Sequence, residues 1–182
     1  MIFRDTALSG VFIIELERIR DERGFFACTW MDSEFARWGL NPNLRQSNIT
    51  FNAQRGTIRG MHFQNEPHQE AKLTRCTRGA IYDVALDLRP GSHTFHRWVA
   101  AELTSENHRM LYVPEGVAHG YQTLSDDAEM FYQVSEHYHP ESARGVRWND
   151  PAFDIRWPLP VTVITRRDAN YPLLDLEVPL RK

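Results

Sequence analysis

The segment Gly56-Thr57-Ile58-Arg59-Gly60-Met61-His62-Phe63-Gln64 carries the first side chains that could do chemistry. On a regular strand, residues two apart share a face, so His62 and Gln64 would point the same way and Arg59 would point the other way. A bulge at Gly60 would bring Arg59 and His62 to one cavity. The segment alone leaves open whether His62 is a general base or a hydrogen-bonded structural histidine.

A second histidine ends the segment Pro114-Glu115-Gly116-Val117-Ala118-His119. A Pro-x-Gly turn that feeds a histidine-bearing strand matches the second signature of metal-binding cupin barrels. The first signature would be His62-Phe63-Gln64, in which Gln64 replaces the second histidine of a His-x-His pair. Two imidazoles and an amide suit zinc or iron poorly, because these metals prefer imidazole, thiolate and carboxylate ligands. The residues that keep a metal site open as an alternative are His68 and Glu70.

Tyr132 and Lys72 are the next candidates. Tyr132 lies among apolar residues, a setting typical of a core tyrosine whose hydroxyl is hydrogen-bonded. Burial would also keep that hydroxyl protonated, so Tyr132 could instead donate a proton. Lys72 is the only lysine besides the last residue, Lys182, in a chain that otherwise uses arginine. Its presence hints at a role that arginine does not fill.

Many short β-rich segments, separated by turn residues, must position these side chains. We expect strands at Val11–Glu17, Phe25–Trp30, Arg45–Phe51, Thr57–Gln64, Lys72–Cys76, Ile81–Leu88, Arg97–Leu103, Met110–Val113, His119–Leu124, Met130–Ser135 and Val161–Thr165. The clearest alternation is in Ile81–Leu88, whose even-numbered and odd-numbered residues would occupy opposite faces. Asp32 is expected to cap a short helix over Ser33–Trp38 that ends near Gly39. This pattern predicts an all-β closed barrel or double-sheet jelly roll, with few short helices and an interior that can hold a small ligand.

Composition narrows the function classes. The chain has 182 residues, which predicts a single domain spanning residues 1–182. The net charge of -3 gives no reason to expect binding to nucleic acid or to an anionic membrane. The two cysteines cannot form a disulfide framework, and no apolar run suggests a signal peptide or a membrane span. A reducing, cytoplasmic location is the expectation.

Several short motifs occur in order along nearly the whole chain. They are Asp21-Glu22-Arg23-Gly24-Phe25-Phe26, Gln46-Ser47-Asn48, Arg59-Gly60-Met61-His62-Phe63-Gln64, Lys72-Leu73, the segment Asp83–Arg89, the segment Pro114–Gly120, Tyr132 with Tyr138, Trp148-Asn149-Asp150-Pro151, Ile155-Arg156-Trp157-Pro158 and Arg167-Asp168. Each motif is weak alone, but the ordered set resembles the dTDP-4-dehydrorhamnose 3,5-epimerase family of nucleotide-sugar epimerases. The resemblance implies a cupin-type jelly-roll β-barrel.

The resemblance also implies a reaction and its catalytic residues. The family epimerises C3 and C5 of a nucleotide-linked 4-keto-6-deoxy sugar, by removing a proton to give an enolate and returning one to the opposite face. His62 would be the base and Asp168 would hold its imidazole. Lys72 would stabilise the enolate oxygen, and Tyr132 would be the acid. No metal or organic cofactor is implied, because the ketone of the substrate is the electron sink.

Substrate-binding positions are carried over in the same way. Arg59 matches a phosphate-binding arginine, and the guanidinium suits forked contacts to phosphate oxygens. Arg23 matches an arginine that reaches the site from the partner subunit, so the resemblance implies a homodimer with exchanged N-terminal strands. The other positions matched to substrate contacts are Phe26, Gln46, Asn48, His119, Tyr138 and Arg167.

Three positions depart from the family pattern. Cys28 and Ala143 stand where the family usually has glutamate, and Arg167 stands where it usually has lysine. The loss of two carboxylates removes hydrogen-bond acceptors, which is how a polar site changes its substrate selectivity. Because the proposed base, acid and lysine are present, the chemistry can be retained on a different substrate. The nucleotide, the sugar and the choice between C3, C5 and both therefore stay open. Two alternatives also stay open: a metal-dependent cupin oxygenase or isomerase using His62 and His119, and a non-catalytic sugar-binding barrel.

Overall fold

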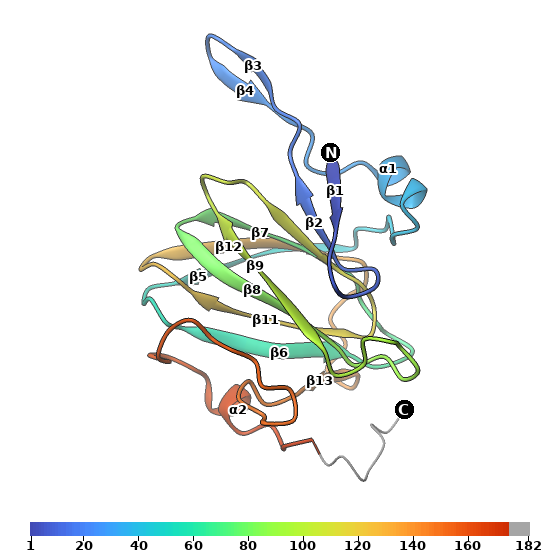
Figure 1. Cartoon of the computed structure of the whole chain (residues 1–182), viewed down its shortest axis with the longest axis vertical. Helices are drawn as coiled ribbons and strands as arrows, with labels where there is room; N and C mark the ends of the chain where they lie inside the picture. The colour runs from blue at the N-terminus through green and yellow to red at the C-terminus, as the bar shows by residue number, and fades with distance from the viewer. Residues whose placement is uncertain (175–182) are drawn as a thin grey trace.

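Two antiparallel sheets face each other and enclose the core (Figure 1). The computed structural model describes residues 1–174. The first sheet contains, in spatial order, β1 (Ile2–Asp5), β2 (Phe12–Glu15), β10 (Met110–Val113), β7 (Lys72–Arg78), β12 (Ala128–Val134) and β5 (Gln46–Asn52). The second contains β13 (Ala143–Gly145), β6 (Ile58–Gln64), β11 (Val117–Thr123), β8 (Ala80–Asp87) and β9 (Trp98–Thr104). The prediction of an all-β jelly roll with few short helices is confirmed.

The alternation predicted for Ile81–Leu88 separates two layers of core. Ile81 and Ala85 pack between the sheets, where they are fully buried. Val84 and Leu86 point the other way and pack under the segment after β13, against residues such as Phe153. Both faces of β8 are therefore buried, which fits the apolar residues on both sides of this strand, and its two aspartates, Asp83 and Asp87, are buried as well. The contacts of Val84 and Leu86 hold the segment from Val146 to Ile155 against the second sheet.

The predicted strands between Arg45 and Ser135 are confirmed, with ends that differ by one or two residues. The strand predicted at Val11–Glu17 is β2, which is shorter. Two predictions are wrong. Only Phe25 and Phe26 of the predicted Phe25–Trp30 strand lie in a strand, β4 (Gly24–Phe26). The segment Val161–Thr165 is not a strand, and it makes isolated bonds to the start of β6, such as Ile58 N to Val163 O at 2.9 Å.

The predicted helix exists one residue earlier than expected. It is α1 (Asp32–Arg37), and Met31 occupies the N-cap position without a side-chain hydrogen bond. Asp32 accepts a bond from the backbone N–H of Ser33 inside the first turn. At 6 residues α1 is the longer of the two helices in residues 1–174, so no helical segment there could cross a bilayer.

A hairpin projects from the barrel near the N-terminus (Figure 1). It consists of β3 (Ile19–Asp21) and β4, which pair only with each other within the described residues. Every residue of the two strands is exposed. The second helix, α2 (Arg166–Ala169), lies at the other end of the view beside β6 and carries Asp168. Neither β3 nor α2 was predicted from the sequence.

Candidate active site

The irregularity predicted at Gly60 is present. Gly60 has φ +137°, a backbone conformation that side-chain-bearing residues rarely adopt, and a Cβ there would lie 2.5 Å from the Cα of Gly120. The register between β6 and β11 shifts at this crossing. As a result Arg59 and His62 line the same cavity although they are three residues apart.

Two adjoining cavities lie between the sheets. The larger, of about 350 Å³, is lined by Gln46, Asn48, His62, Phe63, Gln64, Glu70, Lys72, Tyr132, Val134, Tyr138, Ala143, Arg144, Arg167 and Tyr171. The smaller, of about 210 Å³, is lined by Thr50, Arg59, His62, Lys72, His119, Tyr121, Met130, Tyr132 and Arg167. His62, Lys72, Tyr132 and Arg167 belong to both linings, so they stand where the two cavities meet.

His62 and Asp168 form a hydrogen-bonded pair on the wall made by β6. The Nε2 atom of His62 lies 2.9 Å from Oδ1 of Asp168, whose side chain is 2% exposed. The other carboxylate oxygen accepts a bond from the backbone N–H of Gly60 at 3.2 Å, and Thr165 caps the helix that carries Asp168. Burial alone would raise the pKa of Asp168, but the bonds from His62, Gly60 and Arg167 outweigh it and lower the pKa to about 2. An ionised carboxylate only accepts, so Nε2 carries a proton, and in the neutral imidazole Nδ1 is then the nitrogen with the free lone pair.

Lys72 and Tyr132 stand on the opposing sheet. Lys72 begins β7 and pairs with Val134 of β12, so it lies beside Tyr132 on the inner face. Its ammonium group contacts the carboxylate of Glu70, and both side chains are largely buried. Burial, reinforced by the charge of Glu70, raises the pKa of Tyr132 above its ordinary value. Tyr132 is therefore a protonated phenol at neutral pH.

The inner face of β5 supplies further polar groups. Gln46 and Asn48 both line the larger cavity, and the amide of Gln46 donates to Asn48 Oδ1 at 2.7 Å. Across the smaller cavity His119 is held through Nε2 by Asp83 Oδ1 at 2.6 Å. Asp83 is fully buried, and it accepts a second bond from the hydroxyl of Thr74. His119 is thus fixed in orientation by a buried carboxylate.

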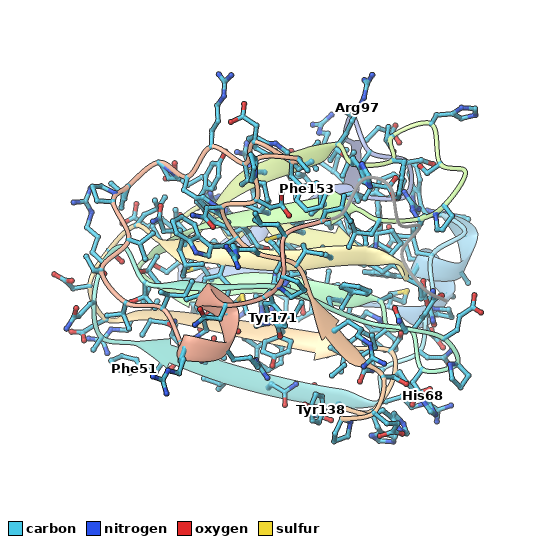
Figure 2. All side chains as sticks on the ribbon, turned by 90° about the horizontal axis from the view of Figure 1, so that it is seen from below. Phe51, His68, Arg97, Tyr138, Phe153 and Tyr171 are labelled. Carbon is cyan, nitrogen blue, oxygen red and sulfur yellow. The ribbon has the colours of Figure 1, made fainter. Side chains whose placement is uncertain are left out.

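The remaining substrate-binding candidates divide into two groups. Arg59, Tyr138 and Arg167 line the cavities, and Figure 2 shows Tyr138 and Tyr171 on the side of the barrel where α2 lies. Arg23 and Phe26 do not reach them, because both belong to the exposed hairpin β3–β4. Within that hairpin the guanidinium of Arg23 bonds to Asp21 at 2.6 Å.

The structure also shows where the three positions that depart from the family pattern lie. Ala143 lines the larger cavity and Arg167 lines both. Cys28 lies outside the two cavity linings, in the loop after β4, where its thiol contacts the carbonyl oxygen of Trp30. Of the three positions, Ala143 and Arg167 are therefore in contact with the space that a ligand would fill.

Sequence reasoning missed three site residues. Glu70 had been considered only as a metal ligand, and its spacing of two from Lys72 is the signal that could have linked them. Tyr171 lines the larger cavity with its ring centroid 6.1 Å from that of His62, and no local signal marked it. Alternation put Asp83 on one face with Ile81 and Ala85 without saying which face is inner, and a carboxylate among apolar neighbours is a signal that could have found it.

The metal-site alternative requires His62 and His119 to share an ion. The two residues are register partners on β6 and β11, but each imidazole is bonded through Nε2 to its own aspartate. Among residues 1–174, the side chains close enough to hold an ion together are instead His68, His139 and Glu141. The geometry fits two positioned imidazoles better than a shared metal.

Comparisons with known proteins agree on one family. The family model described as dTDP-4-dehydrorhamnose 3,5-epimerase matches residues 5–175. A dTDP-4-dehydrorhamnose 3,5-epimerase from Sinorhizobium fredii is 42% identical over 181 residues, covering 99% of this chain and 92% of that protein. The crystal structure of the enzyme of the same name from Elizabethkingia anophelis superposes with a TM-score of 0.92 at 37% identity, covering 95% of this chain and 96% of that one.

A further solved structure contains a sugar nucleotide. It is dTDP-6-deoxy-D-glucose-3,5-epimerase from Legionella pneumophila in complex with dTDP-4-keto-L-rhamnose. It superposes with a TM-score of 0.88 at 35% identity, covering 96% of this chain and 93% of that one. The likeness extends over the whole barrel and includes both sheets that line the cavities.

Proposed function

This chain belongs to the dTDP-4-dehydrorhamnose 3,5-epimerase family, and from that premise we propose that it inverts C3, C5 or both in a nucleotide-linked 4-keto-6-deoxy sugar. The ketone at C4 acidifies the neighbouring C–H bonds, so a base can remove a proton to give an enolate. Inversion follows when a proton returns to the other face. One observation carries the proposal: His62 and Tyr132 come from opposing sheets and line one cavity, with Lys72 beside them.

His62 is the base in this proposal. Its Nε2 is bonded to Asp168, so Nδ1 is the atom that accepts the proton from carbon. Asp168 fixes the ring and stabilises the imidazolium that forms, because the buried carboxylate stays ionised at neutral pH. The proton therefore moves without any change in the protonation of Asp168.

Lys72 and Tyr132 act on the enolate. The ammonium of Lys72 stabilises the negative oxygen at C4, an interaction that strengthens as charge develops in the transition state. Glu70 holds the ammonium at the cavity wall. Tyr132 returns the proton on the face away from His62, and its raised pKa favours the protonated form that this step needs. The substrate's own carbonyl takes up the electron pair, so the proposed steps use no metal or organic cofactor.

In this proposal the diphosphate binds to the arginine side chains that line the smaller cavity. Arg59 is positioned by Asn52, whose side-chain oxygen accepts from Nε at 2.8 Å. Arg167 lies 62% exposed at the junction of the two cavities, and it supplies a second guanidinium. Gln46, Asn48, His119 and Tyr138 provide hydrogen bonds and an aromatic face for the sugar and the base of the nucleotide.

The proposal includes a cytoplasmic homodimer. The hairpin β3–β4 projects from its own barrel and exposes large apolar side chains, with Ile19 and Phe26 each 69% exposed. Such a surface on an otherwise unpaired hairpin suits a second copy of the chain. Arg23 and Phe26 would then complete the partner's cavity. The free cysteines Cys28 and Cys76 are compatible with a reducing compartment.

Proton exchange in D₂O tests the function. We expect nucleotide 4-keto-6-deoxy sugars, followed by NMR, to take up deuterium at C3, C5 or both, and His62→Ala to abolish the uptake. A panel that varies the nucleotide and the sugar identifies the substrate. Binding of every candidate without exchange would favour a non-catalytic sugar-binding barrel. Stoichiometric metal bound by His62 and His119 would favour a metal-dependent cupin instead.

A further inference from the structure

A second cluster of ligand-type side chains lies on two loops that carry residues of the larger cavity, although the cluster itself is outside both cavity linings. His68 comes from the loop between β6 and β7, and His139 and Glu141 come from the loop before β13. Figure 2 shows His68 at the corner of the barrel where Tyr138 also lies. The nitrogen or oxygen donors of the three side chains all lie within 4.8 Å of one another.

Both imidazoles face the same carboxylate. Nδ1 of His139 lies 3.0 Å from Oε1 of Glu141, and Nδ1 of His68 lies 3.9 Å from the same oxygen. The rings are stacked with their centroids 3.5 Å apart and their planes 7° apart. Ser142 adds a hydroxyl 3.0 Å from Nδ1 of His68. Both Nδ1 atoms therefore lie near one oxygen ligand, on nearly parallel rings whose centroids are 3.5 Å apart.

The backbones that carry the two histidines are joined by a buried glutamine. Gln64, 3% exposed, donates to the carbonyl oxygens of His68 and His137 at 2.9 and 3.0 Å. Its own side-chain oxygen accepts from the backbone N–H of His139 at 2.7 Å. The backbone positions of both histidines are thus fixed before any ligand binds, which lowers the cost of ordering the two loops on binding.

We propose that His68, His139 and Glu141 bind one divalent ion of the zinc type, with Nδ1 of each imidazole and a carboxylate oxygen as ligands. Two imidazoles and a carboxylate suit Zn²⁺ and its neighbours in the first transition row, whereas Mg²⁺ and Ca²⁺ require oxygen ligands. Tetrahedral Zn²⁺ with Zn–N bonds near 2.0–2.1 Å places its ligand atoms about 3.4 Å apart. To share the ion, the two rings must turn out of their stacked arrangement so that both Nδ1 lone pairs point to it. Such rotations are open to His68 and His139, which are about 30% exposed, and to Glu141, which is 64% exposed.

The ion would join the loop after β6 to the loop before β13. These loops lead directly into cavity-lining residues, with Glu70 and Lys72 after His68 and with Tyr138 before His139. Zinc would therefore stiffen one end of the larger cavity without touching the proposed base or acid. This site does not depend on the identity of the sugar nucleotide, or on catalysis.

Calorimetric titration of the tag-free, chelator-treated full chain with ZnCl₂ tests the proposal. We expect one Zn²⁺ per chain, and at least about tenfold weaker binding in His139→Ala. The control is His137→Ala, an exposed histidine of the same loop that contributes only its backbone oxygen to Gln64. Zn²⁺ should also protect both loops from amide hydrogen exchange in the parent and in His137→Ala, but not in His139→Ala.

The outcomes separate clearly. Equal affinities for the parent and for His139→Ala, or no Zn²⁺ binding by the parent, would overturn the proposal. Loss of binding in His62→Ala but not in His139→Ala would move the ion to the barrel interior and would also overturn it. Circular dichroism of each metal-free variant checks that the fold is intact before binding is compared. Glu141→Gln provides a second variant, at an exposed position where misfolding is not expected.

Discussion

Asp168 accepts a hydrogen bond from His62 across 106 residues of sequence, at 2.9 Å, and its other oxygen binds the backbone of the glycine that shapes β6. One buried carboxylate therefore fixes both the imidazole and the strand irregularity that positions it. Replacing the carboxylate of Asp168 is therefore expected to change the tautomer and the orientation of His62 together.

Asp168→Asn should lower the rate of C–H exchange by roughly 10²–10⁴-fold, because an uncharged amide cannot stabilise the imidazolium. Solvent deuterium uptake by NMR measures the effect. Asp154→Asn is the control, since Asp154 has a 79% exposed side chain outside both cavities. Near-parental exchange in Asp168→Asn would remove Asp168 from the mechanism.

The same carboxylate should affect stability at low pH. The pKa of Asp168 is lowered from 3.8 to about 2 in the folded chain, so its ionised form stabilises the fold above about pH 4. That contribution, roughly 2 kcal/mol, is lost as the pH falls through about 2. Urea unfolding at several pH values should show the parent losing its advantage over Asp168→Asn on acidification. A constant difference between the two proteins would contradict this linkage.

Lys72→Met should reduce the turnover number by roughly 10²–10³-fold and change the KM much less, because the ammonium acts mainly on the charge of the transition state. Methionine preserves most of the buried volume. Exchange reactions stopped at timed intervals give the turnover number, and the affinity for an unreactive sugar nucleotide shows whether binding has changed. A pure binding defect would assign Lys72 to substrate binding alone.

The fold followed from the sequence where local pattern and tertiary structure agree. Alternation in Ile81–Leu88 predicted both faces of β8, and the glycine at position 60 predicted the irregularity that joins Arg59 to His62. Short elements were missed, because β13 and α2 are specified by the surface they pack on and not by their own propensities. The segment Val161–Thr165 is the opposite case: its composition is typical of a strand, but it does not pair along its length with a neighbouring strand.

The site followed from the sequence only partly, for a related reason. The resemblance selected residues that the two cavities bring together, including Lys72 and Tyr132. Contacts between side chains were not predictable, since the pairing of Glu70 with Lys72 depends on how the loop before β7 turns. The approach of Tyr171 depends on the docking of the C-terminal segment, which no local pattern encodes.

Tyr132→Phe should impair inversion more than exchange at the first carbon, because removal of the proton by His62 does not need the phenol. Comparing deuterium uptake with the appearance of the inverted sugar gives the ratio. Glu70→Gln is the companion variant, and it should lower the pKa of Tyr132 in a titration of labelled tyrosine, since the charge of Glu70 contributes to raising it. Equal loss of exchange and inversion in Tyr132→Phe would argue against a dedicated acid.

Mixing two inactive variants tests the role of the hairpin. If Arg23 completes the partner's cavity, a mixture of Arg23→Ala and His62→Ala should recover about a quarter of the parental activity, because half of the random dimers contain one intact site of two. The double variant mixed with Arg23→Ala is the control and should stay inactive. Absence of recovery, together with a confirmed exchange of subunits, would place Arg23 in its own chain's site or in none.

The position of Asp168 outside both sheets separates folding of the barrel from competence for exchange. All thirteen strands in residues 1–174 precede α2, so both sheets can pair without the segment that carries this carboxylate. A barrel without a docked α2 therefore has the proposed base and acid but no anchored imidazole, and it should exchange protons as slowly as Asp168→Asn. A chain ended after Thr165 should keep the circular dichroism of the barrel and lose most of the deuterium exchange. Activity then reports that α2 has docked, as well as that the barrel is folded.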